Sequence, residues 1–216
     1  MNFVIITHVQ HIKDNTKYYG YAPYVREMNI WLKYVDNVTV VAPIENIKLD
    51  AIHLDYNHKN LKFKEVQNFN TTSFLNSLQT FFKVPAILWT IFWAMKNADH
   101  IHLRCPGNMG LLGCMVQVLF PKIPKTAKYA GNWDPNAKQP FTYKIQKWIL
   151  NNTFLTKNMK VLVYGEWEGS SKNIKPFFTA TYSEVKKETI LPRSVKGKIN
   201  FVFVGTLSIG KMPLYA

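Results

Sequence analysis

Apolar residues form several short continuous runs along this chain, and such runs are typical of strands buried on both faces of a parallel sheet. Residues 2–7 and 37–42 are the clearest examples. Residues 61–66 alternate apolar and polar positions, which predicts a third strand near an edge of the sheet. Further strands are predicted at residues 99–103, 126–130 and 160–164.

Helical periodicity separates these strands. Pro23 suits a first helical turn, and Tyr24, Met28, Trp31 and Val35 follow at helical spacing. The most apolar stretch covers residues 73–98, and Pro85 within it predicts a break into two helical pieces. Two more helices are predicted at residues 110–120 and 143–150, and polar loops at 8–20 and 165–175.

Strands that alternate with helices imply right-handed crossovers and a doubly wound parallel sheet, so the expected fold class is α/β and Rossmann-like. The pattern changes at residues 184–198, which are charged and polar and contain Pro192 and Gly197, as in a linker. A new strand is predicted at 200–204. We therefore expect one domain at 1–183, a linker at 184–198, and at 199–216 the start of a second domain, truncated before most of it.

The stretch around residues 84–95 is too short to span a bilayer. An apolar helix of this kind either covers the sheet or lies on a membrane surface, and the first alternative is favoured because helices that are apolar all round are usually buried. With no spanning segment expected and with two cysteines that form no disulfide or zinc pattern, a cytoplasmic, reducing location is expected.

The chain is strongly basic. It has 27 Lys and Arg against 13 Asp and Glu, a net charge of 27 − 13 = +14. Such a surface favours anionic partners such as phosphates, nucleic acid or acidic lipid, although lysine can also serve as a solubilising residue. Charge alone leaves both interpretations open.

Ligands of an open α/β sheet bind outside the carboxyl ends of the strands, where the predicted loops are 8–20, 104–108, 131–134 and 165–172. None contains GxGxxG or GxxxxGK[ST], and the chain lacks GxSxG. These absences disfavour a dinucleotide dehydrogenase, a P-loop nucleotidase and an α/β hydrolase. The chain also lacks an Asp-x-Asp pair that would hold a metal against a diphosphate, so phosphate contacts would come from Lys, Arg and backbone N–H groups.

Three segments together resemble a known family. They are residues 98–112, ADHIHLRCPGNMGLL, 128–135, KYAGNWDP, and 201–211, FVFVGTLSIGK. The last is similar to the F-V-G-R-L-x-x-x-K-G segment that opens the donor-binding domain of GT-B glycosyltransferases of the family-4 type. The chain thus resembles the N-terminal domain of such an enzyme plus the start of its C-terminal domain.

The resemblance implies a nucleotide-diphosphate-sugar donor, bound mainly by the C-terminal domain. It implies that Gly205 allows close backbone approach to the diphosphate and that Lys211 pairs with it. Thr206 stands where the family usually has Arg, and its hydroxyl can still donate to phosphate. Gly20 is the nearest match to the family's glycine-rich loop facing the donor phosphates.

The resemblance places the acceptor, a glycan or lipid-linked hydroxyl, in the N-terminal cleft. Asp134 is expected to orient that hydroxyl and Trp133 to stack on a sugar, with Asn132 beside them, although Asp134-Pro135 is also common turn chemistry. His8 is a candidate catalytic residue and Arg104 a candidate anion contact, with a surface ion pair as its alternative. Anomeric retention, no metal, no cofactor and peripheral contact with an anionic inner leaflet are also expected.

Two other functions stay open at this stage. The first is a binding module for nucleic acid or another acidic polymer, which the charge supports but the scattered lysines do not. The second is a sugar-nucleotide epimerase of the GT-B type. Under the glycosyltransferase hypothesis, which is the leading one, nucleic acid is not a partner and the fragment alone is expected to be inactive.

Overall fold

The computed structural model describes residues 1–67 and 74–178 and the positions 189, 197 and 202, with side chains omitted for 74–81. The chain divides into two compact units, Met1–Thr181 and Tyr182–Ala216. All helices and strands of the described residues belong to the first unit. The domain boundary at 183, the linker at 184–198 and the second domain from 199 lie almost entirely outside the described residues and stay predictions.

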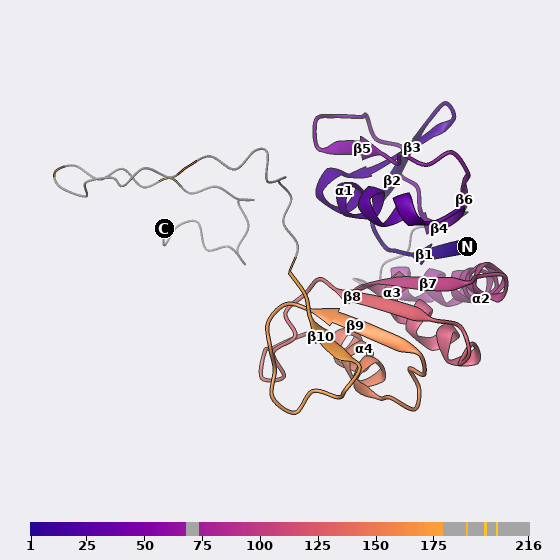
Figure 1. The fold of residues 1–216 in the computed structure, drawn as a ribbon. Helices are drawn as coiled ribbons and strands as arrows, with labels where there is room; N and C mark the ends of the chain where they lie inside the picture. The colour runs from indigo at the N-terminus through magenta and orange to yellow at the C-terminus, as the bar shows by residue number, and fades with distance from the viewer. Residues whose placement is uncertain (68–73, 179–188, 190–196, 198–201, 203–216) are drawn as a thin grey trace. The chain divides into compact units, whose positions relative to one another are not determined.

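A seven-stranded parallel sheet forms the centre of the first unit (Figure 1). Along the sheet the order is β10 (Ile174–Pro176), β9 (Met159–Val163), β8 (Lys125–Tyr129), β7 (His100–Cys105), β1 (Asn2–Ile6), β4 (Asn37–Pro43) and β6 (Leu61–Val66). The six strands predicted before residue 184 are confirmed as β1, β4, β6, β7, β8 and β9. The strand predicted at 200–204 lies almost entirely outside the described residues. The alternating strand β6 lies at an edge, as its pattern predicts.

Helices cover both faces of the sheet, which makes the fold α/β and Rossmann-like. On one face, α1 (Ala22–Trp31) and the 3-10 turn Leu32–Tyr34 pack on Phe3 and Ile5. On the other face, Val4 and Ile6 join a core with α2 (Phe74–Lys96), α3 (Asn108–Val116) and α4 (Phe141–Asn151). A second 3-10 turn, Gln117–Leu119, follows α3. Successive residues of β1 therefore serve opposite cores, which is why its sequence is continuously apolar.

The prediction of a polar loop at residues 8–20 is wrong. The structure has a hairpin there, formed by β2 (His11–Asp14) and β3 (Lys17–Tyr21), and β5 (His53–Asp55) joins it in a three-stranded antiparallel sheet. Asn15 turns the hairpin with φ +52°. The strands are short and expose Lys13, Asp14 and Lys17, so their composition is that of a loop even though His11 and Ile12 are buried.

The prediction of a helix break at Pro85 is also wrong, because α2 continues through Pro85 as one helix. A proline inside a helix costs about 3 kcal/mol. Ile87, Ile91 and Met95 lie on one side of α2 and are buried against the sheet. Burial of such side chains stabilises by about 1.5–3 kcal/mol each, which offsets the cost.

The helix α2 covers the sheet, as favoured from its sequence, but it is not buried all round. Phe82, Trp89 and Trp93 on its other side are 74%, 65% and 38% exposed. No helix of the described residues combines the length and apolar character needed to cross a membrane. The loop predicted at 165–175 ends in the short strand β10, which the sequence did not indicate.

Candidate functional site

The order of the strands creates a crevice at the carboxyl end of the sheet. The chain runs from β1 outward through β4 and β6, and then returns to the other side of β1 with β7, β8 and β9. The reversal places β1 beside β7, with Val4 opposite Ile101. The loops after these two strands diverge to opposite faces, and such a switch point is where open α/β sheets bind ligands.

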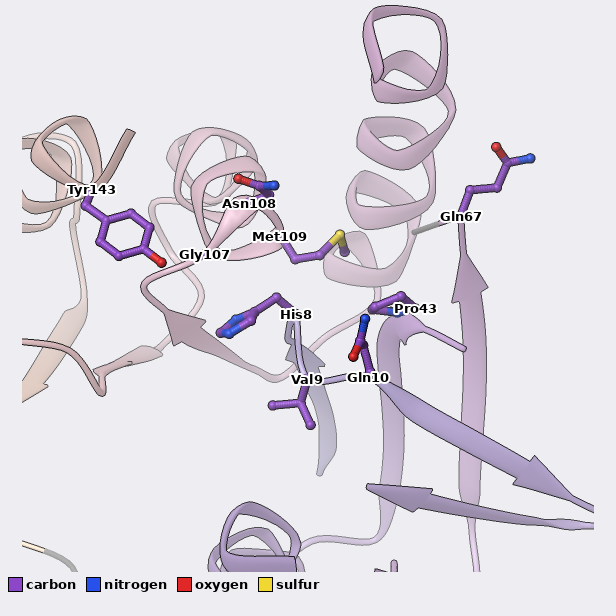
Figure 2. Close-up of a pocket in the computed structure, with 9 residues that line it drawn as sticks. All are labelled: His8, Val9, Gln10, Pro43, Gln67, Gly107, Asn108, Met109 and Tyr143. Atoms are coloured by element: carbon purple, nitrogen blue, oxygen red, sulfur yellow. The ribbon is translucent and has the colours of Figure 1, made fainter. Parts of the chain in front are cut away.

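A cavity of about 440 Å³ lies at this switch point (Figure 2). Its lining comes from the ends of four strands and from the first turn of α4: His8, Val9, Gln10, Pro43, Gln67, Gly107, Asn108, Met109 and Tyr143. The cavity therefore occupies the position that the fold predicts for a ligand. Its polar lining groups are an imidazole, amides and a phenol.

His8 is the sequence-predicted residue that the structure places in this cavity. It follows Thr7, whose Oγ1 accepts a hydrogen bond of 3.1 Å from the Val9 N–H and so fixes the turn after β1. The ring is exposed at the mouth of the cavity, yet its pKa lies below the ordinary 6.5. Partial loss of its water shell lowers the pKa most, and the positive charge of Arg104 lowers it further. A neutral imidazole at pH 7 can accept a proton.

Gly107 makes room for that ring. Its φ of +148° and ψ of +167° belong to a region that is essentially restricted to glycine. A Cβ added there would lie 2.6 Å from His8 Nδ1. In Figure 2 the ring of His8 and the hydroxyl of Tyr143 both turn toward this loop. Glycine is therefore required both by the backbone and by the approach of His8.

The helix α3 begins directly after Gly107. The Leu111 N–H donates to the Gly107 carbonyl over 2.9 Å, and the Gly107 N–H donates to Gln146 Oε1 over 3.3 Å. The first turn of α3 thus borders the cavity at Asn108 and Met109. Helix N-termini carry partial positive charge, so this wall favours electron-rich groups such as hydroxyl or phosphate oxygens.

Gln67, Asn108 and Tyr143 line the cavity but were not predicted from the sequence as site residues. A usable signal existed for two of them. Gln67 directly follows a predicted strand, and Asn108 closes one of the loops named as ligand-facing. Tyr143 begins a predicted helix, and nothing in its local pattern indicates that it turns toward the switch point.

A compact charged cluster occupies the α1 face of the sheet below the same edge. The Lys128 ammonium on β8 lies 2.7 and 2.6 Å from the two carboxylate oxygens of Glu27 on α1. Arg104 on β7 lies beside Lys128 in the sheet register, and its Nη1 is 3.6 Å from Glu27 Oε2. The side chains of Lys128, Glu27 and Arg104 are only 2%, 11% and 15% exposed.

Arg104 was expected to be either an anion contact or a surface ion pair. The structure gives a third arrangement, a largely buried guanidinium packed 5.4 Å from the centre of the Tyr24 ring. Glu27 and Lys128 were not among the site residues predicted from the sequence. Lys128 lies inside a predicted buried strand, and charged residues are rarely buried without a partner. Its position was therefore a signal for a buried ion pair.

Asn132, Trp133 and Asp134 are not among the residues that line the switch-point cavity. Asn132 Oδ1 accepts from the Asp134 N–H and Asp134 Oδ1 accepts from the Asn136 N–H, each over 2.8 Å, so both side chains build turns. Trp133 is 5% exposed and packs edge-on against Tyr129, with 5.0 Å between ring centres. Its indole faces the core, which leaves little surface for stacking on a sugar.

Trp133 instead lines a second cavity of about 360 Å³ beside α4. Lys147, Trp148, Asn151 and Trp167 also line it. Lys147 Nζ donates to the main-chain carbonyl of Asp134 over 2.8 Å, which ties the 132–136 turn to α4.

The remaining predicted residues concern the donor. Gly20 does not lie in a loop after β1, as expected, but within β3, where it is buried. A Cβ there would lie 3.1 Å from Val25 and 3.2 Å from the His11 ring, so its role in the structure is close packing. Gly205, Thr206 and Lys211 lie outside the described residues and stay predictions.

Within the described part of the chain, no group of three or more His, Cys, Asp or Glu side chains is placed to hold a metal ion. No protein-family model matches the chain, and no curated protein matches it.

Proposed function

We propose that this chain is the acceptor-side half of a two-lobed GT-B glycosyltransferase. The enzyme would transfer a sugar from a nucleotide-diphosphate donor to a hydroxyl of a glycan or lipid-linked acceptor. The observation that carries the proposal is the cavity at the β1–β7 switch point, lined by His8, Asn108 and Tyr143. The resemblance of residues 98–112, 128–135 and 201–211 to the family supports the same conclusion.

The cavity has the chemistry that an acceptor hydroxyl needs. In sugar transfer, the acceptor oxygen bonds to the anomeric carbon while the bond from that carbon to the diphosphate oxygen breaks, and the hydroxyl proton must leave. The neutral His8 imidazole at the mouth of the cavity can hydrogen-bond that hydroxyl and take its proton. Negative charge develops on the departing diphosphate, and the first turn of α3 supplies partial positive charge nearby.

The proposal assigns the donor to the segment from residue 199 onward, with Gly205 and Lys211 at the diphosphate. It predicts that Lys211→Ala weakens donor binding by about 1.5–3 kcal/mol, the usual contribution of a hydrogen bond to a charged group. Calorimetric titration of the protein expressed from its complete reading frame with nucleotide-diphosphate sugars measures this directly. Lys175→Ala, which removes an exposed cation on β10, is the matched control and should bind normally.

A second candidate function is binding to an acidic polymer, which the net charge of +14 favours. Both candidates can be compared on one sample. Binding to DNA or polyphosphate that falls steeply with salt, together with no binding of any nucleotide-diphosphate sugar, would favour the polymer. Saturable binding of one such sugar that persists at 200 mM salt would favour the glycosyltransferase.

Contact with an anionic membrane is part of the proposal because the acceptor class includes lipid-linked glycans. The support comes from α2, where Phe82, Trp89 and Trp93 are exposed on the side away from the core. Lys96 Nζ lies 4.4 Å from the Trp93 ring centre, so a cation accompanies the aromatic surface. Aromatic residues next to cations suit the interface of an anionic leaflet.

A further inference from the structure

The cluster of Glu27, Arg104 and Lys128 has an uneven charge. Among themselves these three described side chains are two cations and one carboxylate, a sum of +1. All three side chains are at least 85% removed from solvent. Burial of an uncompensated charge is costly, because the lost hydration is not replaced.

The single carboxylate is already committed to Lys128. Both Glu27 oxygens lie within 2.7 Å of the Lys128 ammonium, and this chelating geometry leaves Arg104 as the outer partner. The Arg104 Nη1 lies 3.6 Å from Glu27 Oε2, beyond hydrogen-bond distance. That nitrogen is buried and has no hydrogen-bond partner.

The other groups near Arg104 do not supply negative charge. Tyr24 presents its ring face, 5.4 Å from the guanidinium carbon, and burial raises the pKa of the Tyr24 hydroxyl, which keeps it neutral. The positive charge of Arg104 contributes to the lowered pKa values of His8 and His102. The guanidinium therefore has a charge and a donor that the described residues leave unmatched, while 15% of its side chain still reaches solvent.

We propose that Arg104 binds a phosphate or diphosphate group of the substrate, and that the Glu27–Lys128 pair holds the guanidinium in place to receive it. A planar guanidinium can donate two parallel hydrogen bonds to a phosphate, and a dianion would reverse the net charge of the cluster. This inference rests on the proposed function and narrows it: the reaction handled at this edge of the sheet involves a phosphorylated substrate. Two sources share this chemistry, the diphosphate of the sugar donor and the diphosphate of a lipid-linked acceptor.

The chain suits a direct test because it has only three arginines, Arg26, Arg104 and Arg193. Their Nε–H signals can be followed by NMR in the ¹⁵N-labelled full chain during titration with inorganic pyrophosphate, and Arg104→Lys assigns one of them. The proposal predicts a saturable shift of the Arg104 signal, with Arg26 unmoved because Arg26 is exposed on the outer side of α1. An Arg104 signal that stays unchanged at millimolar pyrophosphate overturns the proposal.

Affinity measurements complete the test. Arg104→Gln should weaken pyrophosphate binding roughly 10- to 100-fold, whereas Arg26→Gln should leave it unchanged. Equal losses in both variants would mean nonspecific attraction to a basic surface and would overturn the proposal. The NMR titration is made on the unmodified chain and needs only Arg104→Lys, for assignment, so it decides the question even if Arg104→Gln does not fold.

The source of the phosphate is separated by repeating the titration with uridine diphosphate and with a short isoprenyl diphosphate. Tighter binding of the nucleotide assigns Arg104 to the donor, and tighter binding of the isoprenyl compound assigns it to a lipid-linked acceptor; either result supports the site. Pyrophosphate binding at Arg104 without sugar transfer would refute the proposed function and keep the anion site. Sugar transfer without a shift of the Arg104 signal would support the proposed function and refute the anion site.

Discussion

The His8 ring rests on the Gly107 backbone, where a Cβ would come within 2.6 Å of His8 Nδ1. This contact joins the loops after β1 and β7, the two strands that flank the switch point. The position of the candidate base is therefore set by a residue more than ninety positions away, through the absence of a side chain.

Replacing Gly107 with alanine should displace His8. The backbone conformation costs about 1–3 kcal/mol for a residue with a Cβ, and the new methyl group also overlaps the imidazole. We expect a lower unfolding midpoint in urea and a changed His8 imidazole NMR signal. Gly169→Ala is the control, because Gly169 also has a positive φ, +72°, but nothing within 4 Å of its added Cβ. An unmoved His8 signal in Gly107→Ala would contradict the contact.

The sheet could be predicted from sequence because each of its long strands is a local pattern. Continuous apolar runs identify β1 and β4, whatever the rest of the chain does. The β2–β3 hairpin escaped prediction because its turn at Asn15 lacks the usual Asn-Gly or Asp-Gly signal. The break predicted at Pro85 was wrong because local helix propensity does not include the core contacts that α2 gains by continuing as one helix.

The site was predicted in part, for a related reason. Position at the end of a strand identified His8 and Arg104 correctly as residues of the carboxyl edge. The partners of Arg104 were not predictable, because Glu27 and Lys128 are 101 residues apart in sequence and meet through the fold alone. Trp133 and Asp134 follow β8 as expected, but packing and turn hydrogen bonds occupy them.

The Glu27–Lys128 pair should show strong energetic coupling. Glu27→Gln removes the carboxylate that lies beside the buried Lys128 and Arg104 and should cost about 3–5 kcal/mol of unfolding free energy. Lys128→Met should cost less, because Arg104 stands 3.6 Å from the same carboxylate and can replace the lost partner. Urea unfolding of both variants and of the double variant gives the coupling, expected at about 1–3 kcal/mol. Additivity within about 0.5 kcal/mol would argue against a functional ion pair.

Stability should fall as the pH drops below 6.5. Burial lowers the pKa of His102 to about 3 and that of His11 to about 4. Between these values and 6.5, the unfolded chain binds protons that the native chain does not, so acid favours unfolding. Each histidine contributes about 1.4 kcal/mol per pH unit well below 6.5, and nothing above it.

His102→Gln isolates one of these contributions. Glutamine can still hydrogen-bond the Thr126 hydroxyl, which lies 2.9 Å from His102 Nδ1, but it does not titrate. The slope of unfolding free energy between pH 6 and pH 5 should therefore decrease by about one proton equivalent. Identical slopes in the two proteins would show that His102 is not the buried neutral group described here.

The aromatic side of α2 should bind anionic vesicles. Trp89→Ser removes a side chain that is 65% exposed, so it should reduce co-sedimentation with phosphatidylglycerol vesicles while leaving the fold intact. Trp148→Ser is the matched control, because Trp148 is 64% exposed but lies on another helix, α4. Equal binding by both variants, or equal binding to neutral phosphatidylcholine, would count against a membrane role for α2.

Sugar transfer from a nucleotide-diphosphate sugar to membrane lipid extract, by the protein expressed from its complete reading frame, tests the central claim most directly. The account predicts transfer by the unmodified protein and a loss of roughly 100- to 10,000-fold in His8→Ala, the range for removal of a general base. His53→Ala on β5 should transfer normally. Absence of transfer from every donor tested, or full activity in His8→Ala, would contradict the account.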